Sequence, residues 1–122
     1  MIEHFFSLRE TNKPALVVDG SSERRNFLKL LLAKTGIHCV EAEAFDFHLH
    51  LESAKYGTIF LEVQDPDLDG KHFIQRLKVT GAGTYFIAIV ESVSPSFRER
   101  LDAVGFHAFV LKTRLDGVWS IP

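Results

Sequence analysis

Three charged residues stand directly after short apolar runs that predict buried β-strands: Asp19, Glu62 and Lys112. The carboxyl ends of parallel strands meet at one edge of a sheet, so these side chains should converge there. Two carboxylates and one lysine in an apolar frame could bind a cation or a phosphoryl group. The alternative is an ion pair that only satisfies charges at the edge of the sheet.

The elements that would position these residues alternate along the chain. Short apolar runs predict strands at residues 15–18, 37–40, 58–61, 85–90 and 108–111. Helical spacing of apolar residues predicts a helix that follows the turn at Asp19–Ser22 and runs to about Lys34. It also predicts helices over residues 45–54, around Phe73–Leu77, and from Pro95 to Val104. Strands that alternate with helices indicate an α/β domain with a parallel sheet and helices on both faces.

Residues typical of helix ends support these boundaries. Ser21 or Ser22 fits an N-cap, and Ser94 followed by Pro95 fits an N-cap with proline in the first helical position. Gly36 and Gly105 fit the positions just after the two helices, where a left-handed backbone favours glycine.

Composition limits the classes of protein that the chain can belong to. Its 122 residues fit one domain, and its net charge of −2 gives no overall attraction to nucleic acid or to an anionic membrane. A single cysteine, Cys39, excludes an intrachain disulfide. The amino-terminal residues lack the pattern of a signal peptide, and no apolar run is long enough to span a bilayer, so we expect a cytoplasmic protein.

The order of these motifs resembles the response-regulator receiver (CheY-like) family over about Pro14 to Thr113. The resemblance rests on Leu16-Val17-Val18-Asp19, Phe60-Leu61-Glu62, Asp65-Pro66-Asp67-Leu68-Asp69-Gly70, Gly105 and Phe109-Val110-Leu111-Lys112. It implies a flavodoxin-like, doubly wound sheet of five parallel strands in the order 2-1-3-4-5. It also implies roles for the strand ends. In a working receiver, an acidic pair after the first strand holds Mg²⁺ and an aspartate after the third accepts phosphate. A Thr or Ser after the fourth strand and a Lys after the fifth contact the phosphoryl group.

The sequence keeps only part of this set. Asp19 and Lys112 are present, but Gly20 stands at the second acidic position, Glu62 at the phosphoacceptor position and Val90 at the hydroxyl position. One lost carboxylate should weaken metal binding, so we expect no metal, or at most weak Mg²⁺ at Asp19 and Glu62. Glu62 is one methylene longer than aspartate and could pair directly with Lys112. The resulting site would be either locked in an active-like state or a relic without a switch, and the loss of the hydroxyl at Val90 favours the relic.

Two further positions depart from the family pattern. Phe109 stands at the position of the receivers' switch aromatic, where it has no hydroxyl to reorient, so it should simply pack. Thr113 stands where the family usually has proline after a cis bond. We expect either a trans bond with a shifted loop or a strained cis bond there.

The ends of the chain also differ from the family pattern. Residues 1–13 form an amino-terminal extension to a receiver-like domain over residues 14–122. Only ten residues follow Lys112, too few for a full fifth helix. The fifth helix is therefore short or missing, or the chain is a fragment of a longer protein. The apolar residues of segment 2–10 could cover the surface that a missing helix would expose; a frayed terminus is the alternative.

Two other patterns give only weak evidence for a binding site. Asp65, Asp67 and Asp69 match the start of a calcium loop, but the twelfth position is Arg76. Arg24 and Arg25 could attract an anion, but a solvated helix face is the favoured interpretation.

These observations favour a degenerate pseudo-receiver that acts in signal transduction through phosphorylation-independent protein–protein interaction, without enzymatic activity or a cofactor. Its expected partner is a signalling protein, its own effector domain or a second copy in a homodimer, with no direct binding to nucleic acid or membrane. The resemblance places the partner surface on Ser96–Val104 and Ala108–Leu111. The alternatives are a phosphorylatable receiver with a rearranged acceptor site at Asp19 or Asp65, and a small-ligand binder, which no glycine-rich loop supports.

Overall fold

The computed structural model describes residues 13–44, 55–64 and 83–115 of the chain. They form one five-stranded, all-parallel sheet in the order β2-β1-β3-β4-β5. Its strands are β1 (Ala15–Val18), β2 (Cys39–Ala42), β3 (Thr58–Glu62), β4 (Tyr85–Val90) and β5 (Ala108–Leu111). The described helices are α2 (Ser22–Lys34), α5 (Pro95–Val104) and α6 (Lys112–Leu115). The predicted doubly wound sheet and its strand order are confirmed.

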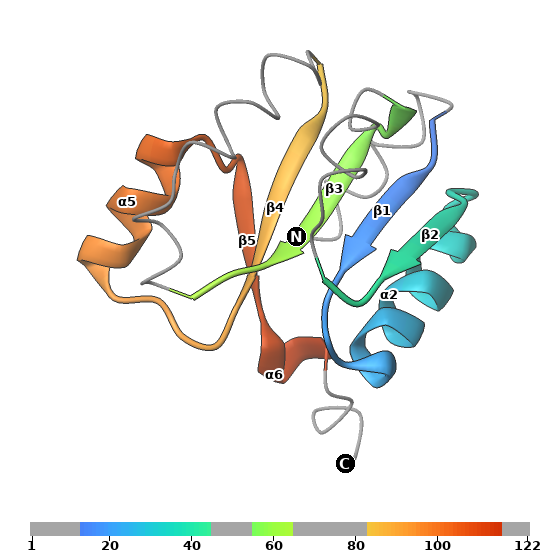
Figure 1. Ribbon diagram of the computed structural model, residues 1–122, viewed down its shortest axis with the longest axis horizontal. Coiled ribbons are helices and arrows are strands. Elements are labelled where there is room, and N and C mark those ends of the chain that lie inside the picture. Colours follow the sequence, from blue (N-terminus) through green and yellow to red (C-terminus); the bar gives the residue numbers. More distant parts are fainter. Residues whose placement is uncertain (1–12, 45–54, 65–82, 116–122) are drawn as a thin grey trace.

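Alternate strand residues pack on opposite faces of the sheet, as the two-residue period of a strand requires. On one face, α5 contributes Phe97, Leu101 and Val104 to a core that also contains Leu61 and Val90. On the other face, α2 contributes Leu28 and Leu32, and α6 contributes Leu115. Figure 1 shows α5 at the left of the sheet and α2 at the right, with the short α6 below the strands. The central strands are buried on both faces, which explains their continuous apolar sequences.

Helix α2 begins and ends as its sequence predicts. The Ser21 hydroxyl accepts a hydrogen bond from the Arg24 amide at 3.2 Å, so Ser21 is the N-cap. Gly36 follows the helix with a left-handed φ of 82°. The Ile37 amide then donates to the Leu32 carbonyl, which closes the carboxyl end of the helix.

The second strand lies two residues later than predicted, at Cys39–Ala42 instead of residues 37–40. The closure of α2 is the physical reason. Because the Ile37 amide bonds back to Leu32, Ile37 belongs to the end of the helix and cannot pair with β1. The pairing starts with Cys39 opposite Ala15.

Helix α5 agrees with its predicted capping. The Ser94 hydroxyl accepts from the Phe97 amide at 3.1 Å, and Pro95 follows in the first helical position. Gly105 ends the helix with a left-handed φ of 112°. The chain then turns directly into β5, which lies at one edge of the sheet.

After β5 the chain continues as the short helix α6, which begins at Lys112. The bond between Lys112 and Thr113 is trans, so of the two arrangements considered for this bond the structure has the trans one. Four further predictions lie outside the described residues: the amino-terminal extension, the helix at 45–54, the turn at 65–70 and the helix around Phe73–Leu77. None of the helices in the described ranges is long and apolar enough to cross a membrane.

Candidate functional site

Asp19 lies just beyond the end of β1, and its side chain is 0 % exposed. One carboxylate oxygen, Oδ1, accepts from the Ser21 amide at 2.8 Å and from Arg24 Nη2 at 2.9 Å. The other oxygen, Oδ2, accepts from Arg24 Nε at 2.9 Å. The two arginine bonds form the parallel, charge-assisted pair that a guanidinium makes with a carboxylate. Asp19 is therefore buried with both of its oxygens bonded.

Arg24 joins Asp19 to the next strand end. Its Nη2 atom, already bonded to Asp19, also lies 3.4 Å from Glu62 Oε2. The arginine side chain is 15 % exposed, so it makes these contacts largely shielded from water. Arg24 comes from the first turn of α2, and helical side chains lean toward the helix amino terminus, so its guanidinium reaches back over the ends of β1 and β3.

Glu62 is the last residue of β3, one residue beyond the predicted end of that strand. Its Oε1 accepts from the Gly20 amide at 3.0 Å, and its Oε2 pairs with Lys112 Nζ at 2.5 Å. Lys112 Nζ also lies 3.8 Å from Glu91, whose side chain is mostly exposed. The structure thus contains the direct Glu62–Lys112 contact that the sequence suggested.

Opposing effects act on the Glu62 carboxyl group. Burial raises its pKa, but the Gly20 amide, the hydrogen bond and charge of Lys112 and the charge of Arg24 act in the other direction. The second group of effects is larger, and the pKa of Glu62 lies below its usual range. Glu62 is consequently ionised at neutral pH and held in place by two cations.

Asp19, Arg24, Glu62 and Lys112 form what we call the charged cluster. Two carboxylates and two cations balance within it, and both carboxylates bond directly to cations. Within the described ranges, no group of three or more His, Cys, Asp or Glu residues is placed to hold a metal ion. The cluster can stabilise the strand ends, because each of its carboxylates is bonded to a cation.

Two neighbouring positions explain what the cluster lacks. A Cβ atom at Gly20 would lie 3.7 Å from Glu62 Oε1, an ordinary contact distance, so the backbone leaves room for a side chain there. Val90 ends β4 and is 0 % exposed in the core beneath α5. Its position therefore supplies an apolar contact to the core and no hydroxyl group to the cluster.

A groove of about 440 Å³ adjoins the cluster. It runs between the residues after β3 and the start of α5, and Lys112 lines one side of it. The other lining residues are Val63, Gln64, Glu91, Ser92, Ser94 and Phe97. Because Lys112 pairs with Glu62, the groove offers the Gln64 amide, two serine hydroxyls, the largely exposed Glu91 carboxylate and one aromatic side chain.

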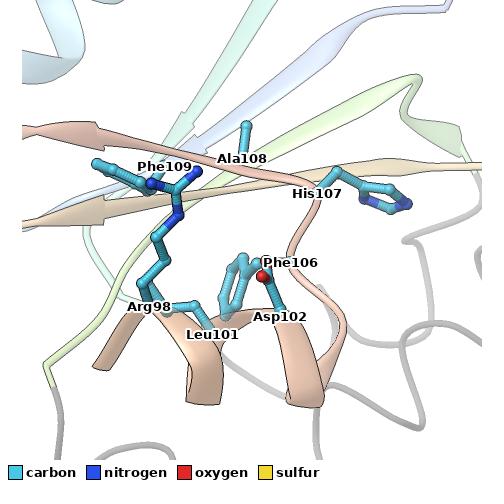
Figure 2. A pocket seen from close by; sticks show the side chains of 7 residues that line it. All are labelled: Arg98, Leu101, Asp102, Phe106, His107, Ala108 and Phe109. Atoms are coloured by element: carbon cyan, nitrogen blue, oxygen red, sulfur yellow. The ribbon is translucent and has the colours of Figure 1, made fainter. Parts of the chain in front are cut away.

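A second hollow, of about 260 Å³, lies on the surface where α5 meets β5. We call this surface the α5–β5 face; it comprises Arg98, Leu101, Asp102, Phe106, His107, Ala108 and Phe109. Figure 2 shows Arg98 extending from α5 toward Phe109, and its guanidinium carbon lies 5.7 Å from the centre of that ring. Phe109 packs against the core, in agreement with the prediction made for it.

His107 fixes the edge of the α5–β5 face. Its Nδ1 accepts a hydrogen bond from the Phe86 amide at 3.0 Å, and its ring stacks on Tyr85 with 4.6 Å between the ring centres. Because Nδ1 accepts, the proton of the neutral ring is assigned to Nε2. This edge of the face is therefore held to β4 by a backbone hydrogen bond and a ring stack, and exposed charged side chains lie around it.

Sequence reasoning found Asp19, Glu62 and Lys112, which the structure brings together, but it missed Arg24. Arg24 and its neighbour were interpreted as a solvated helix face, and that interpretation is wrong. Arg24 bonds to the charged cluster, and Arg25 donates to the Asp19 carbonyl at 2.7 Å and pairs with Glu41. Their position was the available signal. Cations in the first turn oppose the helix dipole, so two arginines there indicate nearby acceptors.

The sequence matches no protein-family model and no curated protein. Its fold, however, is similar to several solved structures. A response regulator from Thermotoga maritima has a TM-score of 0.71 at 21 % identity, covering 89 % of this chain and 97 % of that one. A response regulator receiver protein from Burkholderia phymatum has a TM-score of 0.65 at 27 % identity, covering 88 % and 89 %. A CheY-like protein from Pseudomonas aeruginosa has a TM-score of 0.68 at 13 % identity, covering 88 % and 93 %. The fold is therefore that of receiver domains.

Proposed function

We propose that this chain is a pseudo-receiver, a signalling domain of the receiver fold that binds protein partners without being phosphorylated. The observation that carries the proposal is the contact between Glu62 and Lys112 at 2.5 Å. Glu62 stands where a receiver carries its phosphoacceptor, and Lys112 stands where a receiver binds the phosphoryl group. In this chain the two groups neutralise each other, which leaves neither one to take part in phosphoryl transfer.

The chemistry of Asp19 supports the same proposal against its main alternative, a rearranged acceptor site. An acceptor carboxylate must expose an oxygen to the phosphodonor. Asp19 is 0 % exposed, and both of its oxygens accept hydrogen bonds from Arg24. Asp65, the other alternative acceptor, lies outside the described residues.

The hydrophobic replacement at Val90 supports independence from phosphorylation in a second way. A receiver links its site to its partner surface through a hydroxyl after the fourth strand. Val90 is buried in the same core against which Phe109 packs, and neither side chain has a polar atom. The proposal therefore includes a fixed partner surface and no enzymatic activity.

We place that partner surface on the α5–β5 face. The resemblance to receivers indicates this surface, and it carries a hollow with exposed Arg98 and Asp102 around it, over the buried side chains of Leu101 and Phe106. A second copy of the chain is the partner that can be tested first. Sedimentation equilibrium should then show a dimer that Phe109→Asp dissociates, whereas a monomeric wild type would direct the search to a different protein.

The test of the proposed function uses amide NMR spectra in Mg²⁺, recorded before and after addition of beryllofluoride, a mimic of an acyl phosphate. We expect no change in the wild-type spectrum, and no phosphoryl adduct by mass spectrometry after incubation with acetyl phosphate. Shifts that spread from Gly20 and Glu62 to α5 would contradict the proposal, because they would mean that a working switch remains.

A matched variant shows that the assay can detect a switch on this fold. Gly20→Asp, Glu62→Asp and Val90→Thr together restore the acidic pair, the acceptor and the hydroxyl group. A Cβ atom at Gly20 would meet Glu62 Oε1 at 3.7 Å, an ordinary contact distance, so the backbone does not block the first atom of the added side chain. Combined with Arg24→Met, which removes the guanidinium bonded to Asp19 and Glu62, these three changes should give a protein that responds to beryllofluoride where the wild type does not.

A further inference from the structure

The guanidinium of Arg24 occupies the space between two carboxylates. It bonds to Asp19 at 2.9 Å through two nitrogen atoms, and one of these also lies 3.4 Å from Glu62. The Asp19 carboxylate is fully buried and the Glu62 side chain is 26 % exposed. The cation therefore stands at a position that faces both acids and is largely shielded from solvent.

Two carboxylates that share such a position are the kind of ligand set that a hard divalent cation uses, completed by water. The surrounding amides do not depend on the arginine. The Ser21 amide orients Asp19 and the Gly20 amide orients Glu62, at 2.8 Å and 3.0 Å. Both carboxylates would thus remain aimed at the same space if the guanidinium were removed.

We propose that Arg24 is a built-in cation that fills a divalent-metal position between Asp19 and Glu62 and so makes the charged cluster indifferent to Mg²⁺ and Mn²⁺. Mg²⁺ or Mn²⁺ can enter only by displacing a guanidinium that is bonded twice to a buried carboxylate. The charges are already balanced, so the cluster offers little electrostatic gain in return. Lys112 remains bonded to Glu62 Oε2 when Arg24 is replaced, so the inference assigns the exclusion of metal to Arg24 and not to Lys112.

Arg24→Met tests this inference because it keeps an unbranched apolar stem and removes the charge. We expect millimolar Mn²⁺ to broaden the Gly20 and Glu62 amide signals saturably in Arg24→Met and to leave them sharp in the wild type. Mg²⁺ should raise the melting temperature of the variant alone, since a ligand that binds only the folded state stabilises it. Adding Asp19→Asn to the variant should abolish both effects.

Arg25→Met is the matched control. Arg25 is the adjacent residue and is similarly buried, with 13 % of its side chain exposed, but it bonds to the Asp19 carbonyl and to Glu41 and not to the two carboxylates of the position. It should remain indifferent to metal. Arg24→Lys, which keeps a positive charge, should also remain indifferent.

Three results would overturn the inference: saturable metal binding by the wild type, equal binding by Arg25→Met, or a folded Arg24→Met variant that does not bind metal. If Arg24→Met does not fold, the inference can still be tested in the wild type, by following the NMR signal of the Arg24 Nε–H group during a metal titration. That signal should stay sharp and unshifted in Mn²⁺, and saturable broadening would mean that metal displaces the guanidinium.

The inference shares with the proposed function only the expectation that the wild type ignores Mg²⁺, and their failures can be told apart. A wild type that ignores beryllofluoride, combined with a folded Arg24→Met variant that ignores metal, overturns the inference alone. A wild type that responds to beryllofluoride overturns the proposed function, whatever the variants bind.

Discussion

The charged cluster and the α5–β5 face lie on the same small domain but handle their polar groups in opposite ways. In the cluster, the carboxylates of Asp19 and Glu62 bond to cations and backbone amides within the chain. On the face, the charged groups of Arg98 and Asp102 project from an exposed helix surface around a hollow whose accessible lining is mostly polar. One region uses its charges to hold three strand ends together, and the other leaves its charges accessible.

This difference bears on how function and stability are distributed. Buried charges that bond to each other are costly to disrupt, because removal of one leaves another desolvated and unpaired. Exposed charges contribute little to folding, so they can be selected for binding. Substitutions in the cluster should therefore act mainly on stability, and substitutions on the face, which is the proposed partner surface, should act mainly on partner binding.

The largest expected effect follows from Asp19→Ala. The change leaves Arg24 partly buried without its bidentate partner and deprives the Ser21 amide of its acceptor. We expect the free energy of unfolding to fall by about 3 kcal/mol, as for other broken buried ion pairs. Urea unfolding measures this loss.

Glu41→Ala is the control for that experiment. Glu41 also pairs with an arginine of α2, at 3.2 Å from Arg25, but its side chain is 32 % exposed. Its removal should cost less than about 1 kcal/mol. If Asp19→Ala cost no more than Glu41→Ala, the cluster would not differ energetically from ordinary surface charges.

An intermediate effect is expected from Glu62→Gln, and it should depend on pH. The pKa of Glu62 is lower in the folded protein than its usual value, so folding favours the ionised form. This contribution is complete above the unfolded pKa of a glutamate, about 4.3, and is lost as the pH falls through the lower folded pKa. Unfolding free energies measured across this acidic range should show a shallower slope in Glu62→Gln.

At neutral pH the same substitution should destabilise the protein by about 1.5 kcal/mol, the scale of a hydrogen bond to a charged group. Glu91→Gln provides the comparison, because Glu91 also lies near Lys112 but its side chain is 78 % exposed. If Glu91→Gln changed the pH dependence of the unfolding free energy as much as Glu62→Gln, the position of the charge inside the cluster would have no special effect.

The sequence predicted the framework better than the details of the cluster, and the reason is physical. Apolar spacing and caps such as Ser21 and Gly105 are local signals, so they predicted the positions of α2 and α5 along the chain closely. The contact between Glu62 and Lys112 was also within reach, because the order of parallel strands brings their ends together. Both predictions depend only on where the backbone runs, and not on the conformation of a long side chain.

Two features could not be predicted from the path of the backbone: the start of β2 and the role of Arg24. The start of β2 depends on whether Ile37 closes α2 or pairs with β1, and only the folded helix end decides between them. The role of Arg24 depends on which way a long side chain turns. An arginine in the first turn of a helix can extend into water or fold back over the sheet. The helix dipole indicates that acceptors lie nearby, but it does not say which residues they are.

The smallest expected effect lies on the α5–β5 face, where Arg98→Ala removes a cation from the ring of Phe109 at 5.7 Å. Such a contact at an exposed site contributes about 0.5 kcal/mol. A double-mutant cycle with Phe109→Leu isolates the coupling between the two side chains from their separate effects. We expect a coupling energy near that value. If the face binds a second copy, the same variants should also clearly lose self-association.

A coupling above about 1.5 kcal/mol would place the pair in the range of charged groups that are fully desolvated. The face would then be as firmly organised as the cluster, and the division between a stabilising region and a binding region would not hold.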